Sequence, residues 1–349
     1  MCSEDLYQNL DDFSKEQLRN LADELLEVYT RGDLEGQPKG RVILFLGAAA
    51  NYQAPSAFEE YYSRQDRPPM ATELCNLFID DLYNAEDEDK RDRVKKEKFP
   101  LSWITQYYEE VRDRRKLIEK LAAFIDEKKI SPILKALARM PFKYIITTNY
   151  DNLFEQALAS VNKTFLKGVY KPNKYGKSEY TPDPKEKITI NNPFVYKVHG
   201  DIKETFNNNG DYIPAQDSIV ITDDDYLHFI LRMSQNTENS ERDDANSNCS
   251  YYPIPGSINE AFTGASQNTF LFIGYGLKDY NLRLILKTAL WRKDSNILRA
   301  VKKWSIDLDP DPAIKQIWIN NFRLAFIEKD IWCAVPYLYK LLFKEEMPL

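Results

Sequence analysis

Histidine is scarce in this chain of 349 residues, which contains only His199 and His228. Cysteine is scarce as well, and its four residues form no C-x-x-C pair. That pair is the usual sequence signature of a structural zinc site, so we expect no zinc and no other metal. Widely scattered cysteines are typical of a reducing compartment, which predicts a cytoplasmic protein.

Long apolar runs and an excess of positive charge are also missing. No run approaches the roughly 18 residues needed to span a bilayer. The acidic first twelve residues, MCSEDLYQNLDD, do not resemble a signal peptide. The net charge of −7 argues against nucleic-acid binding, because neutralising phosphates requires clustered Lys and Arg. The composition, with 43% hydrophobic and 29% charged residues, is that of a globular protein.

Short apolar runs alternate with helical patterns along the chain. The runs that predict strands are 41–47, 142–149, 193–200, 269–276, 304–309 and 323–328, and 218–224 is a further strand or an extended segment before a helix. A helix is expected over 277–290, and the charge run 86–98 is expected to be a solvated helix face or loop. Strands separated by helices predict an α/β fold, with a Rossmann-like parallel sheet and helices on both faces.

The same patterns predict the domain organisation. Residues 1–40 comprise a helix and a polar linker, residues 41–335 the sheet domain with an inserted helical module at about 60–140, and residues 336–349 a C-terminal tail. Ser14 and Gln17 predict a capping box for the first helix. Its apolar face would pack on its own domain or on a neighbouring subunit; it is formed by Leu18, Leu21, Leu25 and Leu26.

Small and polar residues cluster where the predicted strands end. The segments are LGAAAN from Leu46, TTNYD from Thr147, KVHGD from Lys197 and FIGYG from Phe272. In parallel sheets, ligands bind outside the carboxyl ends of the strands. One ligand could therefore contact all four segments.

Each segment alone has a structural interpretation beside a functional one. The small residues after Gly47 would form a simple turn or let backbone N–H groups approach a pyrophosphate. Asn149 or Asp151 would cap the next helix or hydrogen-bond a ribose, an amide or an attacking water. His199 would be a satisfied strand-end residue or a general base, whereas His228, within an apolar helical pattern, is expected to be structural.

The order GAAAN…PSAF, TTNYD, KVHGD…IVITDDDY and FIGYGLKDYNLR resembles the sirtuin-like family from about Arg41 to about Glu328. It is most similar to bacterial antiphage-defence members that hydrolyse NAD. The resemblance implies that NAD, as substrate, lies across the carboxyl edge of the sheet. Cleavage of its nicotinamide–ribose bond would give nicotinamide and ADP-ribose, and NAD depletion would serve abortive infection.

The resemblance also implies roles for individual residues. Asn149 matches the asparagine that positions the ribose and the nucleophile, His199 matches the catalytic histidine, and Asp151 matches an aspartate that supports the nicotinamide end. Ala49 and Asn51 replace a glycine and a serine of the family pattern, and the added methyl of Ala49 would narrow the approach to the phosphates without closing it. The residues implied in NAD binding are Gly47, Ala48, Ala50, Phe58, Thr148, Gly274, Gly276 and Asp307.

Two other functions stay open at this point. The first is an NAD-dependent protein deacylase, although the zinc-ribbon cysteines of those enzymes are absent. The second is a module that binds NAD or ADP-ribose with little or no turnover, which the altered glycine loop favours. Because an unregulated NAD hydrolase would be toxic, the resemblance also implies control by assembly or by a partner. Relatives form multimers, and some pair with a HerA-type hexameric ATPase, so we expect a homo-oligomer.

Overall fold

The computed structural model describes residues 3–28, 30, 35–83, 87–170, 183–238, 254–263, 268–277 and 301–349. Nearly all of the helix expected over 277–290 lies outside these residues. Within them, one seven-stranded parallel sheet has the order β3-β4-β2-β1-β5-β6-β7. The strands are β1 (Val42–Leu46), β2 (Tyr144–Thr147), β3 (Leu166–Val169), β4 (Phe194–Lys197), β5 (Thr269–Ile273), β6 (Lys303–Ile306) and β7 (Leu324–Ile327).

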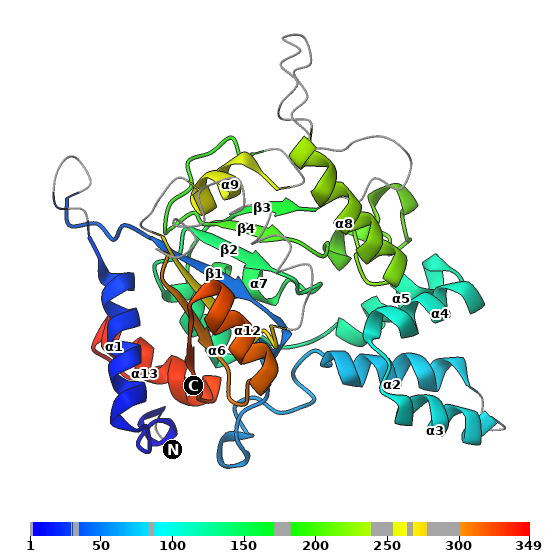
Figure 1. The fold of residues 1–349 in the computed structure, drawn as a ribbon, viewed down its shortest axis with the longest axis horizontal. Helices are drawn as coiled ribbons and strands as arrows, with labels where there is room; N and C mark the ends of the chain where they lie inside the picture. Colours follow the sequence, from blue (N-terminus) through cyan, green and yellow to red (C-terminus); the bar gives the residue numbers. More distant parts are fainter. Residues whose placement is uncertain are drawn as a thin grey trace, which may run out of the picture.

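Helices cover both faces of this sheet (Figure 1). On one face are α1 (Asp12–Leu26), α6 (Pro132–Arg139), α7 (Leu153–Ser160) and α13 (Ile331–Phe343); toward the other are α8 (Asp223–Glu238), α9 (Gly256–Thr263) and α12 (Pro312–Phe322). In β1 every side chain is buried: Leu44 packs with Trp332 on the first face, and Phe45 lies on the second face, which Trp318 also covers. The predicted α/β, Rossmann-like fold is confirmed.

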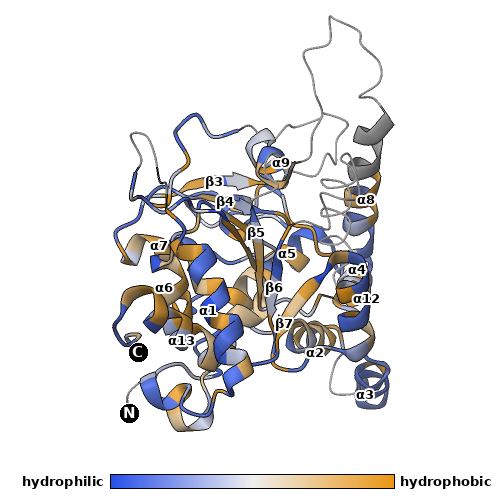
Figure 2. Ribbon diagram, turned by 60° about the vertical axis from the view of Figure 1, so that its left-hand side comes forward, coloured by the Kyte–Doolittle hydropathy of each residue, from blue (hydrophilic) through white to orange (hydrophobic). Residues whose placement is uncertain are grey.

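Residues 71–125, between β1 and β2, form a separate helical module beside the carboxyl edge of the sheet (Figure 1). Its helices are α2 (Ala71–Leu82), α3 (Glu88–Glu97), α4 (Leu101–Val111) and α5 (Arg114–Ile125). Helix α3 coincides with the charge run, buries no residue and is predominantly hydrophilic in Figure 2, so the expectation of a solvated helix is confirmed. The helical module has its own apolar core, to which Leu117 and Phe78 contribute.

The segment 218–222 joins the helical module to the sheet. It forms no strand of the sheet, and α8 follows it from Asp223. Ile219 and Ile221 pack into the core of the helical module, whereas Val220 packs into the core of the sheet. Successive apolar side chains therefore point alternately into the two cores. This period of two makes the segment resemble a strand in sequence.

Helix α1 differs from its predicted form at its start. Asp11 is the N-cap and accepts a hydrogen bond from the Ser14 backbone N–H at 2.8 Å. The predicted Ser14–Gln17 capping box is therefore wrong, and Gln17 instead donates to the carbonyl of Phe326.

The apolar face of α1 is covered by its own domain. Leu18, Leu21 and Leu25 are fully buried in the same core as Trp332 and Leu338 of α13, while Leu26 is 42% exposed. Helix α13 also runs across the expected boundary at 335/336 and belongs to this core. The leucine face is thus not an open surface for a neighbouring subunit.

Candidate active site

Backbone contact joins two loops beside the candidate site, at the point where the sheet order reverses beside β1. The Gly47 N–H donates to the carbonyl of Ile273 at 2.9 Å. A Cβ on Gly47 would lie 2.4 Å from the Gly274 oxygen, and Gly274 has φ +74° with its own Cβ position 2.0 Å from the Ala50 nitrogen. Only glycine fits at both positions, so the ends of β1 and β5 are held in direct contact.

A cavity of about 170 Å³ lies between the strand ends and the helical module. From the sheet side it is lined by Ala48, Asn51, Thr148, Asn149, Tyr150, Asp151 and His199. The opposite wall is formed by Pro68, Pro69, Met70, Ala71, Leu74, Leu101 and Ile125, with Tyr226 of α8. Five residues that the sequence singled out therefore meet at one cavity: Ala48, Thr148, Asn149, Asp151 and His199.

Asn149 is buried and its side chain is only partly satisfied. The Nδ2 group donates to the Gly47 carbonyl at 3.3 Å, and the Oδ1 atom has no hydrogen-bond donor. Asn51 likewise lines the cavity with a buried Oδ1 atom that has no donor. An unsatisfied buried acceptor costs about 1–3 kcal/mol. A ligand or water that donates hydrogen bonds to these two oxygens would recover that free energy.

The Asp151 carboxyl group caps a helix and has a shifted pKa. Its Oδ1 atom accepts from the Leu153 backbone N–H at 3.0 Å, so Asp151, and not Asn149, satisfies the start of α7. Burial raises the pKa of the Asp151 carboxyl, and the positive charge of Lys197 counteracts this in part. The capping interpretation is therefore correct for Asp151. The Oδ1 atom of Asn149 is left to accept a hydrogen bond from a group in the cavity.

His199 lies directly after β4 and is 3% exposed. The following Gly200 has φ +89°, and a Cβ there would lie 2.2 Å from the Ser218 oxygen. This turn lets the His199 carbonyl accept from the Val220 N–H at 3.0 Å. The imidazole ring meets the Tyr226 ring edge-on at 5.4 Å between centroids. His228 is exposed on α8, outside the apolar core that its helical pattern predicts.

The remaining residues assigned to NAD binding do not line this cavity. Ala50 and Phe58 are buried in the core that contains Trp332. Gly276 is exposed with open space around it, and Asp307 lies after β6, where its Oδ1 atom accepts from the Asp309 N–H at 3.3 Å.

The turn after β1 uses its backbone N–H groups internally. The Ala49 N–H donates to the Gly274 carbonyl and the Ala50 N–H to the Gly47 carbonyl, both at 3.1 Å. A phosphate at this loop would have to find other donors, because these two are occupied. The sequence motif alone could not reveal this, since the partners come from β5 and from the turn itself.

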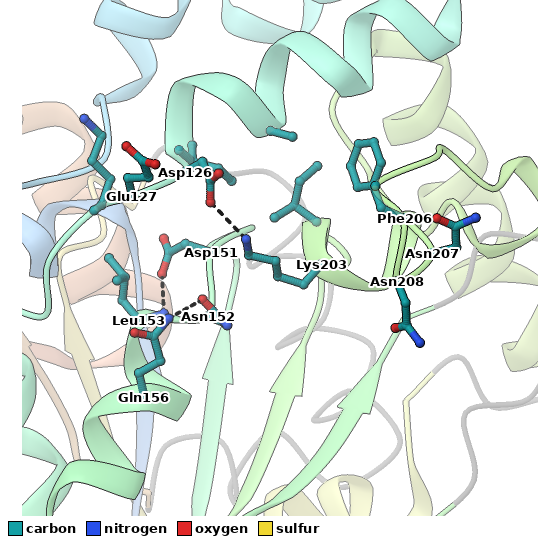
Figure 3. A pocket seen from close by; sticks show the side chains of 15 residues that line it. Asp126, Glu127, Asp151, Asn152, Leu153, Gln156, Lys203, Phe206, Asn207 and Asn208 are labelled. Atoms are coloured by element: carbon teal, nitrogen blue, oxygen red, sulfur yellow. Dashed lines mark hydrogen bonds and ion pairs between the residues drawn. The ribbon is translucent and has the colours of Figure 1, made fainter.

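A second cavity, of about 590 Å³, adjoins the first and shares Ile125 and Asp151 with it (Figure 3). Lys203, from the loop after β4, forms an ion pair at 2.9 Å with Asp126, at the end of α5. The other lining residues are Ala122, Glu127, Lys128, Asn152, Leu153, Gln156, Ile202, Phe206, Asn207, Asn208 and Gly210.

The described residues offer neither a metal-binding cluster nor a membrane-spanning helix. Among the described residues, no group of three or more His, Cys, Asp or Glu side chains is arranged to hold a metal ion. No helix in the described part of the chain combines the length and the apolar character needed to cross a membrane.

Comparison with known proteins places these features in context. A family model described as SIR2-like domain matches residues 143–327. Defense-associated sirtuin 2 of Bacillus subtilis is 24% identical over 297 residues, which cover 84% of this chain and 24% of that protein. NAD(+) hydrolase ThsA of Acinetobacter baumannii is 27% identical over 294 residues, which cover 81% of this chain and 47% of that protein. The chain thus spans about a quarter to a half of the length of these relatives.

A solved structure described as "Structural Basis for the Mechanism and Regulation of Sir2 Enzymes" aligns over 94% of this chain and 98% of that chain. Its TM-score is 0.40 and its sequence identity is 12%.

Proposed function

The chain belongs to the SIR2-like domain family, and we propose that it hydrolyses the nicotinamide–ribose bond of NAD to nicotinamide and ADP-ribose. The observation that carries this proposal is the 170 Å³ cavity, where Asn149 and His199 meet from the ends of β2 and β4. Two relatives are named NAD(+) hydrolase, which supports the same reaction.

The geometry supports different roles for Asn149 and His199. Asn149 is anchored through Nδ2, which leaves its Oδ1 acceptor for a ribose hydroxyl or for the attacking water. His199 would act as base on that hydroxyl or water, because a neutral imidazole has a ring nitrogen that can accept a proton. The oxygen of Asn51 is a second acceptor in the same cavity.

The size of the cavity limits what it would hold. Pockets that enclose a drug-sized ligand are typically about 300–1,000 Å³, and this cavity has about 170 Å³. We therefore assign to it the nicotinamide and its ribose. The rest of NAD would follow the carboxyl edge of the sheet past Gly276 and Asp307.

Replacement of His199 tests the assignment. His199→Ala is expected to abolish nicotinamide release from NAD, with no loss of fold, because the side chain borders a cavity. The matched control is His228→Ala, which removes the exposed histidine and should leave the rate unchanged. Turnover by His199→Ala within tenfold of wild type would remove His199 from the mechanism.

A second candidate, a module that binds NAD or ADP-ribose with little or no turnover, is favoured by one observation. The N–H groups of Ala49 and Ala50 are bound to protein carbonyls and not available to a pyrophosphate. A rise in melting temperature with NAD or ADP-ribose, together with no nicotinamide release under any condition, would support this candidate. Nicotinamide release that is lost in His199→Ala would contradict it.

We also propose that the reaction depletes NAD in antiphage defence under the control of a partner, such as a HerA-type ATPase, or of self-assembly. The name of one relative, Defense-associated sirtuin 2, supports the setting. Any subunit contact would use a surface other than the leucine face of α1, which is buried. Light scattering of the purified chain, with NAD turnover measured with and without the co-expressed ATPase, tests this. A fully active monomer would contradict it.

A further inference from the structure

Lys197 is a fully buried lysine directly beneath the candidate active site. It is the last residue of β4, two positions before His199, and its side chain is 0% exposed. Its side chain lies on the α7 face of the sheet. There its Nζ atom donates to the backbone carbonyl of Asp151 and lies 3.2 Å from the Glu155 carboxylate.

Two further contacts extend this arrangement to the loop after β4. The Nζ atom of Lys197 lies 3.4 Å from Asp201, which is 1% exposed. Asp201 in turn pairs with Lys167 of β3 at 3.1 Å, and its Oδ1 atom accepts from the Lys203 N–H at 2.9 Å. One ammonium group therefore contacts both the TTNYD turn, through Asp151, and the KVHGD turn, through Asp201.

The charge of Lys197 is maintained by its surroundings. Burial alone lowers the pKa of the amine, but the carboxylates of Glu155, Asp201 and Asp151 outweigh that effect and the net shift is upward. A buried ion pair gives little net stability, because the loss of hydration offsets the attraction. Its three directed contacts do, however, fix the geometry of the groups around it.

We propose that Lys197 is a positioning residue for NAD hydrolysis, which ties the turn that carries Asn149 and Asp151 to the turn that carries His199. This inference rests on the proposed function. Lys197 does not line the cavity, so it would act through the backbone of Asp151 and through Asp201. A shift of about 1 Å between reacting groups reduces turnover by roughly 100-fold, which is the size of effect that such a residue controls.

The decisive variant is Lys197→Met combined with Glu155→Gln. Lys197→Met alone would leave Glu155 as a buried carboxylate without its cation, whereas the double variant removes both charges and Asp201 keeps Lys167. The expected result is a folded protein, shown by circular dichroism and a cooperative melting curve, with kcat roughly 10- to 100-fold lower. KM for NAD should stay within about threefold, because no group that touches substrate is changed.

Two controls separate positioning from a general structural effect. Lys303→Met removes another buried strand lysine, whose Nζ donates to the Val301 carbonyl at the start of β6, and should leave kcat unchanged. Glu155→Gln alone keeps the bond from Lys197 to Asp151, so kcat within about threefold of wild type is expected. Glu155→Gln also keeps the proposal testable if the double variant does not fold, since a large loss of kcat in Glu155→Gln would overturn it.

The outcomes distinguish this inference from the function on which it rests. Wild-type protein that releases no nicotinamide would refute the proposed function and this inference together. Release by wild type, with an undiminished kcat in the folded double variant, would refute the role of Lys197 alone. A raised KM with unchanged kcat would also refute it, because that pattern indicates weaker binding and not displaced reacting groups.

Discussion

The sheet and the helical module border the same cavity but are stabilised in different ways. The sheet lies between two apolar cores in which Leu44 and Phe45 of β1 are fully buried. The helical module has a smaller apolar core, into which Ile219 and Ile221 also pack, and one guanidinium group adds several buried contacts to the rest of the chain. Arg114 donates to Asp217 and Asp225, at 2.7 and 2.8 Å, and to the Ile219 carbonyl at 2.7 Å. The cavity thus has one wall held by apolar burial and one in which a buried ion-pair cluster adds to the apolar packing.

The largest effect on stability is expected from Arg114→Met. The carboxylates of Asp217 and Asp225 are 2% and 4% exposed, so the variant would leave two buried charges without their cation. Removal of one partner from a buried ion pair costs about 3–5 kcal/mol, to be measured by urea unfolding. The neighbouring Arg115→Met is the control: Arg115 is 64% exposed and pairs with Glu119 in the same helix, so a change below about 0.5 kcal/mol is expected. Equal effects of the two variants would contradict the role of Arg114.

Leu44→Ala tests the apolar wall. It should destabilise the chain by about 2–5 kcal/mol, because it leaves a cavity in the centre of the sheet core. Leu308→Ala, at a leucine that is 63% exposed, is the control and should change the free energy of unfolding little. The loss in Leu44→Ala should be the same at low and high salt, since no charge is involved. A salt-dependent loss would contradict the division between an apolar wall and a charged one.

Asn149→Ala tests the proposed role of this residue in NAD hydrolysis. Turnover should fall by roughly 100-fold or more if the amide positions the nucleophile. The free energy of unfolding should fall by only about 1 kcal/mol, for the lost bond to the Gly47 carbonyl. Asn152→Ala, in the same turn but outside the 170 Å³ cavity, should keep wild-type turnover. Full activity in Asn149→Ala would show that Asn149 is structural.

The smallest effect concerns Glu73, at the start of α2. Hydrogen bonds from Arg67 lower the pKa of the Glu73 carboxyl to about 2, with a further contribution from the Met70 N–H. Because the pKa in the folded protein lies below the ordinary 4.5, the stabilisation is present above about pH 4.5 and is lost as the pH falls toward 2. Glu73→Gln should therefore cost about 2 kcal/mol at pH 7 and only a small part of that near pH 2.

Chemical unfolding of both proteins across this pH range measures the difference. Glu88→Gln, at an exposed residue of α3, should show no such pH dependence. A difference between Glu73→Gln and wild type that stays constant from pH 7 to pH 2 would contradict the assignment to this carboxyl.

Strands with continuous apolar runs could be predicted from the sequence, and β3 could not. Its sequence LKGV contains a charged residue and a glycine, and Lys167 pairs with Asp201 and Glu204 from the segment after β4. That strand exists because β4 offers it backbone partners. The pairing is a tertiary contact, which a local pattern does not contain.

The candidate site was predictable to a similar degree. Asn149, Asp151 and His199 could be singled out because strand ends in parallel sheets meet at one edge. The prediction could not identify Tyr226 or Met70 as lining residues, since their place depends on the packing of α8 and the helical module. Nor could it show that Phe58 turns into the core.

The position of β1 in the sheet also has a consequence during synthesis. Its hydrogen-bonded neighbours are β2, about 100 residues later, and β5, about 220 residues later. At roughly 5–20 residues per second on the ribosome, β1 would wait roughly 10–45 s for its second neighbour. During that time VILFL is an apolar strand with an open edge, which is the kind of segment that pairs with other chains. Productive folding of this chain therefore depends on how β1 is shielded while the polypeptide is still being made.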